Sequence, residues 1–368
     1  MIAKSRTRDV NKRRKRQFRG ETDDSKCLVT NKDHSRGPDC RCHALERRRS
    51  GRIQLLLAIE LKEQGSFFVG GRTETVSPDN DITVDQMYVQ YQIPQDAKRH
   101  FPVVMIHGCC LSGKSWEETP DGRMGWNTYF VQRNRPTYVV DQVSRARSGF
   151  DATVFNQVKA GTLPPSSLPS ITQVSHQSSW NIFRFGLTFG QPFTNLQFPI
   201  AQVEGLYQQE IPDLNSLLPA DNPTYTNLST LAKSLDGAVL MGHSESGFFP
   251  QFSALVDTTK IKGLITLEHN CNVFTDVQIK TLAKIPQLIV FGDFIELFPQ
   301  WVTANQSCTN YVARIKAAGG DITFIHLPDI GIHGNSHMMM LDKNNLQVAD
   351  VVLDWIDKHV GKRGGGKQ

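Results

Sequence analysis

The stretch VLMGHSESG, residues 239–247, decides the fold. An apolar run leads into a Gly-x-Ser-x-Ser turn, and two phenylalanines then open a helix-compatible segment. Small residues at Gly242 and Ser246 allow a strand to turn tightly into a helix, which lifts Ser244 above the edge of a sheet. The start of such a helix directs free N–H groups toward a developing anion. The pattern predicts a nucleophile at Ser244, with a plain turn serine as the alternative.

Short apolar runs on both sides of this stretch alternate with helix-compatible segments. Two antiparallel opening strands are expected at residues 66–70 and 83–92, and a closing amphipathic helix at 346–360. Further strands are expected at 102–106, 137–140, 237–241, 263–267, 287–291 and 321–327. Continuous apolar strands of this kind belong to a mostly parallel sheet with helices on both faces. The chemistry of such sheets lies beyond the carboxyl ends of the strands.

Charge divides the chain of 368 residues into two unlike parts. Residues 1–52 hold 17 Lys and Arg against 7 Asp and Glu, so they carry +10, whereas the whole chain carries +5. The body after residue 52 is therefore acidic, with a net charge of −5. The basic part is expected to be a disordered extension, because it has too little apolar content to fold alone. Nucleic-acid binding would depend on this extension alone and is not expected of the body.

One α/β domain is expected over residues 53–362, followed by a flexible tail at 363–368. Residues 151–230 interrupt the alternation with Pro, Ser, Gln and aromatic residues, which predicts a cap over the site or a peripheral subdomain. No apolar run approaches the roughly 18 residues of a membrane span, so an integral membrane protein is excluded. Cys27, Cys40, Cys42 and His43 match no common zinc spacing. No metal is expected.

A serine nucleophile needs a base and an acid that orients the base. His337 precedes an apolar, helix-prone run after the last strand and is the favoured base, with His333 as the alternative. The turn after the strand at 287–291 favours Asp293 as the acid. Glu268, which ends the strand at 263–267, is the other candidate. His243 is expected to pack inside the fold.

The turn His107-Gly108-Cys109-Cys110 follows the strand at 102–106. A backbone N–H at Cys109 and another at Glu245 are expected to form an oxyanion hole, because these two positions supply the donors in this type of site. The adjacent Cys109 and Cys110 could be bridged or could be two free thiols.

Residues 64–360 closely resemble a family of bacterial serine esterases in the α/β-hydrolase superfamily. The matching stretches are GSFFVGGR (65–72), VDQMYV (84–89), IHGCCL (106–111), TPDGRMGW (119–126), IFRFG (182–186), VFGD (290–293), HGNSHMMM (333–340) and NNLQVAD (344–350). The resemblance implies an α/β-hydrolase fold with a cap insertion and a carboxylic-ester hydrolase that uses no cofactor. Amide hydrolysis by the same residues and a non-catalytic binding protein are the alternatives.

The resemblance also implies roles for particular residues. Ser244, His337 and Glu268 would form the triad, so that Glu268 replaces Asp293 as the acid. Cys109 and Cys110 would form a disulfide bond beside the oxyanion turn. Family members look secreted or periplasmic and dimeric, which favours an extracytoplasmic location and a possible homodimer, although this sequence shows no clear signal peptide. Glu245 departs from the family, which carries a neutral Gln there, and its carboxylate should oppose an oxyanion unless it points outward.

Overall fold

A computed structural model describes residues 59–97, 99–214 and 222–363. The basic extension at 1–52, the cysteine and histidine group within it, residues 53–58 and all but the first residue of the tail lie outside the described residues. The described residues belong to the compact unit Ala58–Gln368.

The core of this unit is an eight-stranded sheet with the order β1-β2-β4-β3-β5-β6-β7-β8. β1 pairs with β2, and β2 with β4, in antiparallel fashion, whereas all the other pairs are parallel. The strands are β1 (Leu61–Ser77), β2 (Asn80–Pro94), β3 (Val103–Ile106), β4 (Thr137–Asp141), β5 (Ala238–His243), β6 (Ile261–Leu267), β7 (Gln287–Phe291) and β8 (Ile322–His326). This topology confirms the predicted α/β-hydrolase fold.

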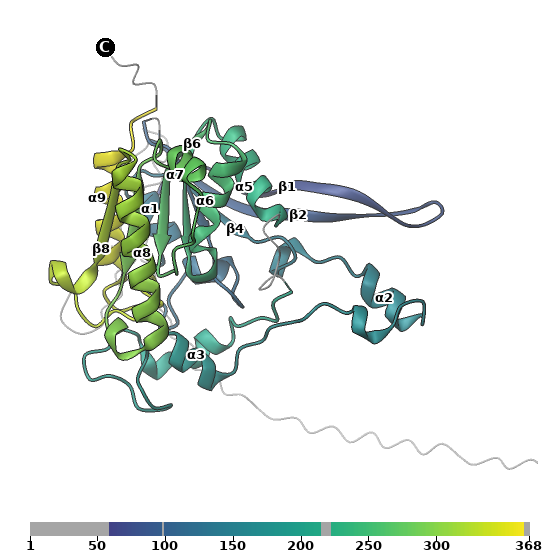
Figure 1. Ribbon diagram of the computed structural model, residues 1–368, viewed down its shortest axis with the longest axis horizontal. Coiled ribbons are helices and arrows are strands. Elements are labelled where there is room, and N and C mark those ends of the chain that lie inside the picture. The colour runs from purple at the N-terminus through teal and green to yellow at the C-terminus, as the bar shows by residue number, and fades with distance from the viewer. Residues whose placement is uncertain (1–58, 98, 215–221, 364–368) are drawn as a thin grey trace, which may run out of the picture. The chain divides into compact units, whose positions relative to one another are not determined.

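The central strands are buried on both faces, as their continuous apolar runs predict. Every residue of β3, β4, β5 and β7 is buried. The opening hairpin is longer than expected, because β1 and β2 continue their pairing as far as Ser77 and Asn80. Its outer part extends beyond the rest of the sheet (Figure 1). Both faces of that part are exposed, and most of its residues are polar. The sequence therefore shows no apolar run there that would predict a strand.

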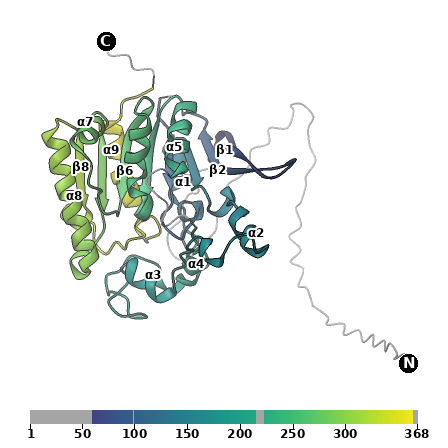
Figure 2. The same ribbon diagram turned by 45° about the vertical axis from the view of Figure 1, so that its right-hand side comes forward.

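Helices cover both faces of the sheet (Figures 1 and 2). α1 (Trp126–Gln132) and α9 (Asn345–His359) pack together on one face. α5 (Pro223–Ser234), α6 (Phe249–Val256), α7 (Asp276–Leu282) and α8 (Pro299–Ala317) pack in sequence on the other face. Short 3-10 turns are η1 (Gly113–Trp116), η2 (Ala146–Ser148), η3 (Pro165–Ser167), η4 (Ile200–Gln202), η5 (Ser244–Phe248), η6 (Ile295–Leu297) and η7 (Leu327–Ile330).

The described residues of the segment between β4 and α5, 142–214 and 222, form no strand of the sheet. This segment holds the short helices α2 (Thr153–Lys159), α3 (His176–Ile182) and α4 (Glu204–Tyr207). α5 begins inside the range 151–230 expected for the insertion, yet it packs against β1, β2 and β5. We therefore call residues 151–222 the insertion.

A disulfide bond joins Cys271, which follows β6, to Cys308 in α8. The sequence analysis did not predict this bond. In the part of the chain that the structure describes, no helix is both long enough and apolar enough to cross a membrane.

Candidate active site

Ser244 stands at the sharp turn from β5 into η5, as the elbow pattern predicts. Its φ is +55°, a left-handed conformation that is uncommon outside glycine and typical of strained functional turns. The turn is so tight that a Cβ on Gly242 would lie 1.9 Å from the carbonyl oxygen of Ser246. The Ser246 hydroxyl donates to the Ile106 carbonyl at 2.9 Å and is fully buried, so it serves the turn.

His337 lies on the loop after β8 with its ring fully buried. Its Nδ1 is 3.3 Å from Oε2 of Glu268, and its Nε2 has no hydrogen-bond partner among the described residues. Phe183 stacks on the ring at 5.6 Å, and Trp301 contacts it at 4.5 Å between ring centroids. Burial lowers the pKa of His337, while Glu268 opposes that shift. The ring is therefore held as a neutral imidazole with one nitrogen free to accept a proton.

Glu268 ends β6 in a left-handed conformation, with φ of +55°. Its carboxylate is fully buried and is held by both terminal nitrogens of Arg184, at 2.7 and 2.6 Å. The Gly292 N–H donates to the same carboxylate. Burial raises the pKa of Glu268, but Arg184 and His337 outweigh burial and bring it to about 2. Glu268 is thus an ionised group that faces the base.

The alternative pair, Asp293 and His333, lies together, and no hydrogen bond or ion pair joins either residue to His337 among the described residues. Asp293 accepts from the backbone N–H groups of Phe294 and Gly334, each at 2.7 Å. His333 is 61% exposed and stands 3.9 Å from Asp293. The structure places Glu268, and not the pattern-favoured Asp293, beside His337.

The turn at residues 107–110, where the oxyanion hole is expected, packs closely against Ser244. A Cβ on Gly108 would lie 2.8 Å from the Ser244 Cβ, so only glycine fits there. The Cys110 N–H donates to Asp213 at 2.9 Å. The Cys109 and Cys110 sulfurs are 2.7 Å apart, and both thiols are free in this structure. The disulfide bond between them stays a prediction.

Glu245 does not point outward, because it is bound to a buried arginine. Arg145 contacts Oε2 of Glu245 at 2.7 Å and Oδ1 of Asp213 at 2.6 Å. It also donates to the Gly108 carbonyl at 3.3 Å. Burial raises the pKa of Glu245, and Arg145 opposes that shift. The charge that departs from the family pattern is thus paired beside the oxyanion turn.

Three further histidines surround the site: His107 and His243 are fully buried, and His269 is half-buried. His243 Nε2 donates to the His337 carbonyl at 2.8 Å, which fits its expected packing role. Burial lowers the pKa of His243 well below its usual range and brings those of His107 and His269 to about 4. All three are neutral near pH 7.

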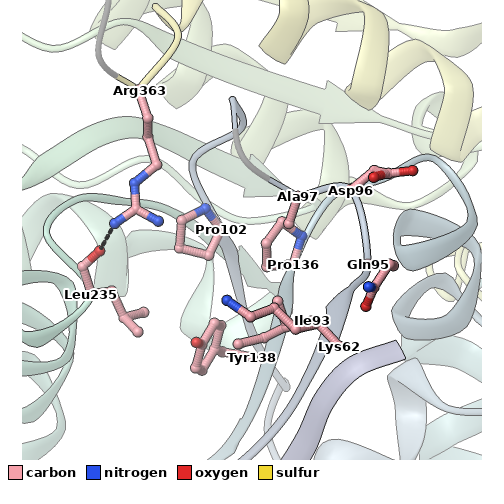
Figure 3. A pocket seen from close by; sticks show the side chains of 10 residues that line it. All are labelled: Lys62, Ile93, Gln95, Asp96, Ala97, Pro102, Pro136, Tyr138, Leu235 and Arg363. Carbon is pink, nitrogen blue, oxygen red and sulfur yellow. Dashed lines mark hydrogen bonds between the residues drawn. The ribbon is translucent and has the colours of Figure 1, made fainter. Parts of the chain in front are cut away.

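Ser244 and Glu268 line one cavity of about 210 Å³, together with His269, Asn270, Gln300, Trp301 and Ala304. A larger cavity of about 480 Å³ lies where Pro102 and Pro136 precede β3 and β4 (Figure 3). That position is the amino end of these parallel strands, and none of the candidate catalytic residues lines it. Because sheets of this type bind ligands at the carboxyl ends of their strands, the smaller cavity is the candidate active site.

A metal site has little support among the described residues. Cys109, Cys110 and Asp213 are the group whose ligand atoms lie close enough, within 4.8 Å of one another. The Asp213 carboxylate is already bound to Arg145 and to a backbone N–H. A buried guanidinium beside it disfavours a cation.

The sequence analysis missed Arg145, Arg184 and Asp213 as contributors to this site. Arg184 lies in the matching stretch IFRFG, yet no local pattern connects it with a carboxylate 84 residues away. The same holds for Arg145 and Glu245, which are 100 residues apart. An even number of cysteines in the body was the only signal for the bond between Cys271 and Cys308.

Comparison with known proteins agrees with the geometry. No known protein-family profile matches the chain. A solved bacterial esterase is 45% identical and superposes with a TM-score of 0.78, over 86% of this chain and 99% of the esterase. A "Probable secreted lipase phiG" of a fungal species (strain ATCC 74256) is 26% identical over 79% of this chain and 89% of its own length. The chain therefore belongs to the family of that bacterial esterase, among the enzymes of the α/β-hydrolase fold.

Proposed function

We propose that the chain hydrolyses carboxylic esters through an acyl-enzyme formed on Ser244. The observation that carries the proposal is the buried contact between His337 and Glu268, beside a serine in a strained turn. His337 Nε2 would take the proton of Ser244 as the hydroxyl oxygen attacks the ester carbonyl. It would then return that proton to the departing alcohol, and a water molecule would release the acid in a second, equivalent cycle.

The oxyanion would be held by the backbone N–H groups of Cys109 and Glu245. The Cys110 N–H is already donated to Asp213, so Cys109 is the candidate donor on this turn. The loss of one such donor typically costs about 3 kcal/mol of transition-state stabilisation. A disulfide bond between Cys109 and Cys110 would stiffen the same turn. The substrate would be a small-molecule ester, and a homodimer is compatible with the proposal.

Labelling with a fluorophosphonate probe tests the nucleophile. We expect the label on Ser244, and no label and no p-nitrophenyl ester hydrolysis in Ser244→Ala. Full activity in that variant would refute Ser244 as the nucleophile. A folded wild-type protein that takes no label and hydrolyses no ester would favour a non-catalytic binding protein. A parallel panel of p-nitroanilides of the same acids separates ester from amide hydrolysis.

Matched substitutions test the base and the acid. We expect Glu268→Gln and His337→Gln to lose at least 100-fold in kcat/KM, on the scale of general-base catalysis. Asp293→Asn and His333→Gln serve as controls, because the two residues form a separate pair. A greater loss in either control than in its counterpart would reverse the assignment.

An extracytoplasmic location follows from the same proposal. The fungal relative is named as secreted, and the bond between Cys271 and Cys308 is of a kind that persists in oxidising compartments. Alkylation of the purified native protein before and after reduction tests both cysteine pairs. If Cys271 and Cys308 are alkylated without reduction, this argument for the location fails.

A further inference from the structure

Arg184 is a residue of the insertion that binds the Glu268 carboxylate directly. It follows α3, and its side chain is fully buried. Its Nε donates to the Asp293 carbonyl at 2.9 Å, while its two terminal nitrogens bind the Glu268 carboxylate. The guanidinium carbon also lies 4.9 Å from the Trp301 ring, which lines the cavity.

The Glu268 carboxylate is consequently shared between a cation and the base. Oε2 accepts from Arg184 at 2.7 Å and faces His337 Nδ1 at 3.3 Å. A planar guanidinium that binds both oxygens fixes the plane of a carboxylate as well as its position. Without it, a fully buried carboxylate would have too few partners to remain ionised.

We propose that Arg184 is a positioning residue of the esterase: it orients Glu268 toward His337 and takes up part of the carboxylate's charge. The inference rests on the proposed function. The neighbouring Phe183 supports it. Its carbonyl accepts a hydrogen bond from the backbone N–H of His337 at 3.0 Å, and its ring stacks on the imidazole. Two consecutive residues of the insertion therefore hold the base and the acid.

The groups that face His337 determine what a pH profile will report. His243 contacts the ring at 4.6 Å, and His269 also acts on it, but both have pKa values lowered by burial. On its own loop, Asp342 binds Ser336, and burial raises the pKa of Asp342 to about 7. The remaining charged groups are Glu268 and Arg184, and Arg184 is the group that the test changes.

Removal of Arg184 should shift the acidic limb of the kcat/KM profile upward. The limb reports the first proton taken up by the pair of Glu268 and His337. A nearby cation opposes that proton whichever member receives it, so the apparent pKa rises when the cation is lost. Asp342 is present in every variant, and its contribution cancels in the comparison.

The experiment compares Arg184→Met, Arg184→Lys and wild type on p-nitrophenyl acetate from pH 5 to 9. For Arg184→Met we expect at least a tenfold loss in kcat, a change in KM below twofold, and an acidic limb raised by about one pH unit. Arg184→Lys keeps the positive charge but cannot bind both carboxylate oxygens as the planar guanidinium does. It should therefore lower kcat with a smaller shift of the acidic limb. Arg314→Met is the control, because Arg314 likewise binds a carbonyl and a carboxylate, but at the surface of α8.

An unshifted acidic limb in both Arg184 variants would overturn the proposal, whatever their rates. If Arg184→Met does not fold by circular dichroism, the shift in Arg184→Lys decides alone. Fluorophosphonate labelling of wild type separates this outcome from a failure of the proposed function. An unlabelled wild type refutes the esterase mechanism, whereas a labelled wild type with unshifted variants refutes only the role of Arg184.

Discussion

Replacement of Arg145 by methionine should damage the oxyanion hole in a way that a second substitution repairs. Arg145 and Asp213 are fully buried, and the Glu245 side chain is 17% exposed. Their contacts of 2.6 and 2.7 Å would be lost, leaving two carboxylates without their cation. Removal of one partner from a buried ion pair costs about 3–5 kcal/mol, and we expect urea unfolding of Arg145→Met to show a loss in that range.

The rate should fall as well, because Glu245 carries a proposed oxyanion donor on its own backbone. An uncompensated carboxylate there opposes the developing anion by up to the worth of one donor, about 3 kcal/mol, or roughly 100-fold in kcat/KM. Glu245→Gln in the Arg145→Met background removes that charge while it keeps the side-chain volume. We expect kcat/KM of the double variant to be at least tenfold higher than that of Arg145→Met.

The ratio of the two kcat/KM values, double variant over Arg145→Met, isolates the carboxylate, because His337 titrates in both proteins. Burial raises the pKa of Glu245, and loss of Arg145 removes the charge that opposed this shift. The single variant should therefore regain activity as the pH falls and Glu245 takes up a proton. The ratio should be largest at pH 9 and should fall as the pH is lowered. A ratio near one throughout, or a double variant slower than the single, would refute the reasoning.

Three further predictions concern stability and the oxyanion turn. Cys271→Ser with Cys308→Ser should lower the free energy of unfolding by about 4 kcal/mol, because the bond closes a loop of 37 residues; a loss below 1 kcal/mol in urea titrations would contradict this. The pKa of Asp342 is about 7 in the native state, above its ordinary value of 3.8, because the group is buried. Native stability should therefore decline as the pH rises from 4 to 7, by up to about 4 kcal/mol, and Asp342→Asn should abolish this decline in urea titrations at several pH values. Gly108→Ala should lower kcat/KM at least 100-fold, since the added methyl group meets the nucleophile, whereas Gly361→Ala, with no atom within 4 Å of its new Cβ, should be silent.

The features that the sequence predicted well are those that depend on neighbouring residues. The run before Gly242 and the small residue at 246 indicated both β5 and the turn that exposes Ser244. The central strands were predicted to within two residues at each end, because their burial on both faces leaves a continuous apolar run. The outer part of the opening hairpin escaped notice, because it is exposed on both faces and carries no such run.

The acid of the proposed triad could not be chosen from local pattern. Asp293 and Glu268 both follow central strands, and only the three-dimensional path of the loop after β8 brings His337 to Glu268. The pattern alone favoured Asp293, and the family resemblance favoured Glu268. Arg184 is separated from its carboxylate by 84 residues, so residue type and local spacing do not indicate the pairing.

The insertion is joined to the body by two buried ion pairs of opposite polarity. Arg184 of the insertion binds a carboxylate of the body, and Arg145 of the body binds Asp213 of the insertion. This arrangement limits how insertions can be exchanged between related enzymes. A transplanted segment that lacks either partner would leave Glu268, the proposed acid, or Arg145, beside the proposed oxyanion hole, without its buried counter-charge of the insertion. Chimeras that keep both charges and vary the residues at the cavity mouth are the ones that could acquire a new substrate range with the chemistry intact.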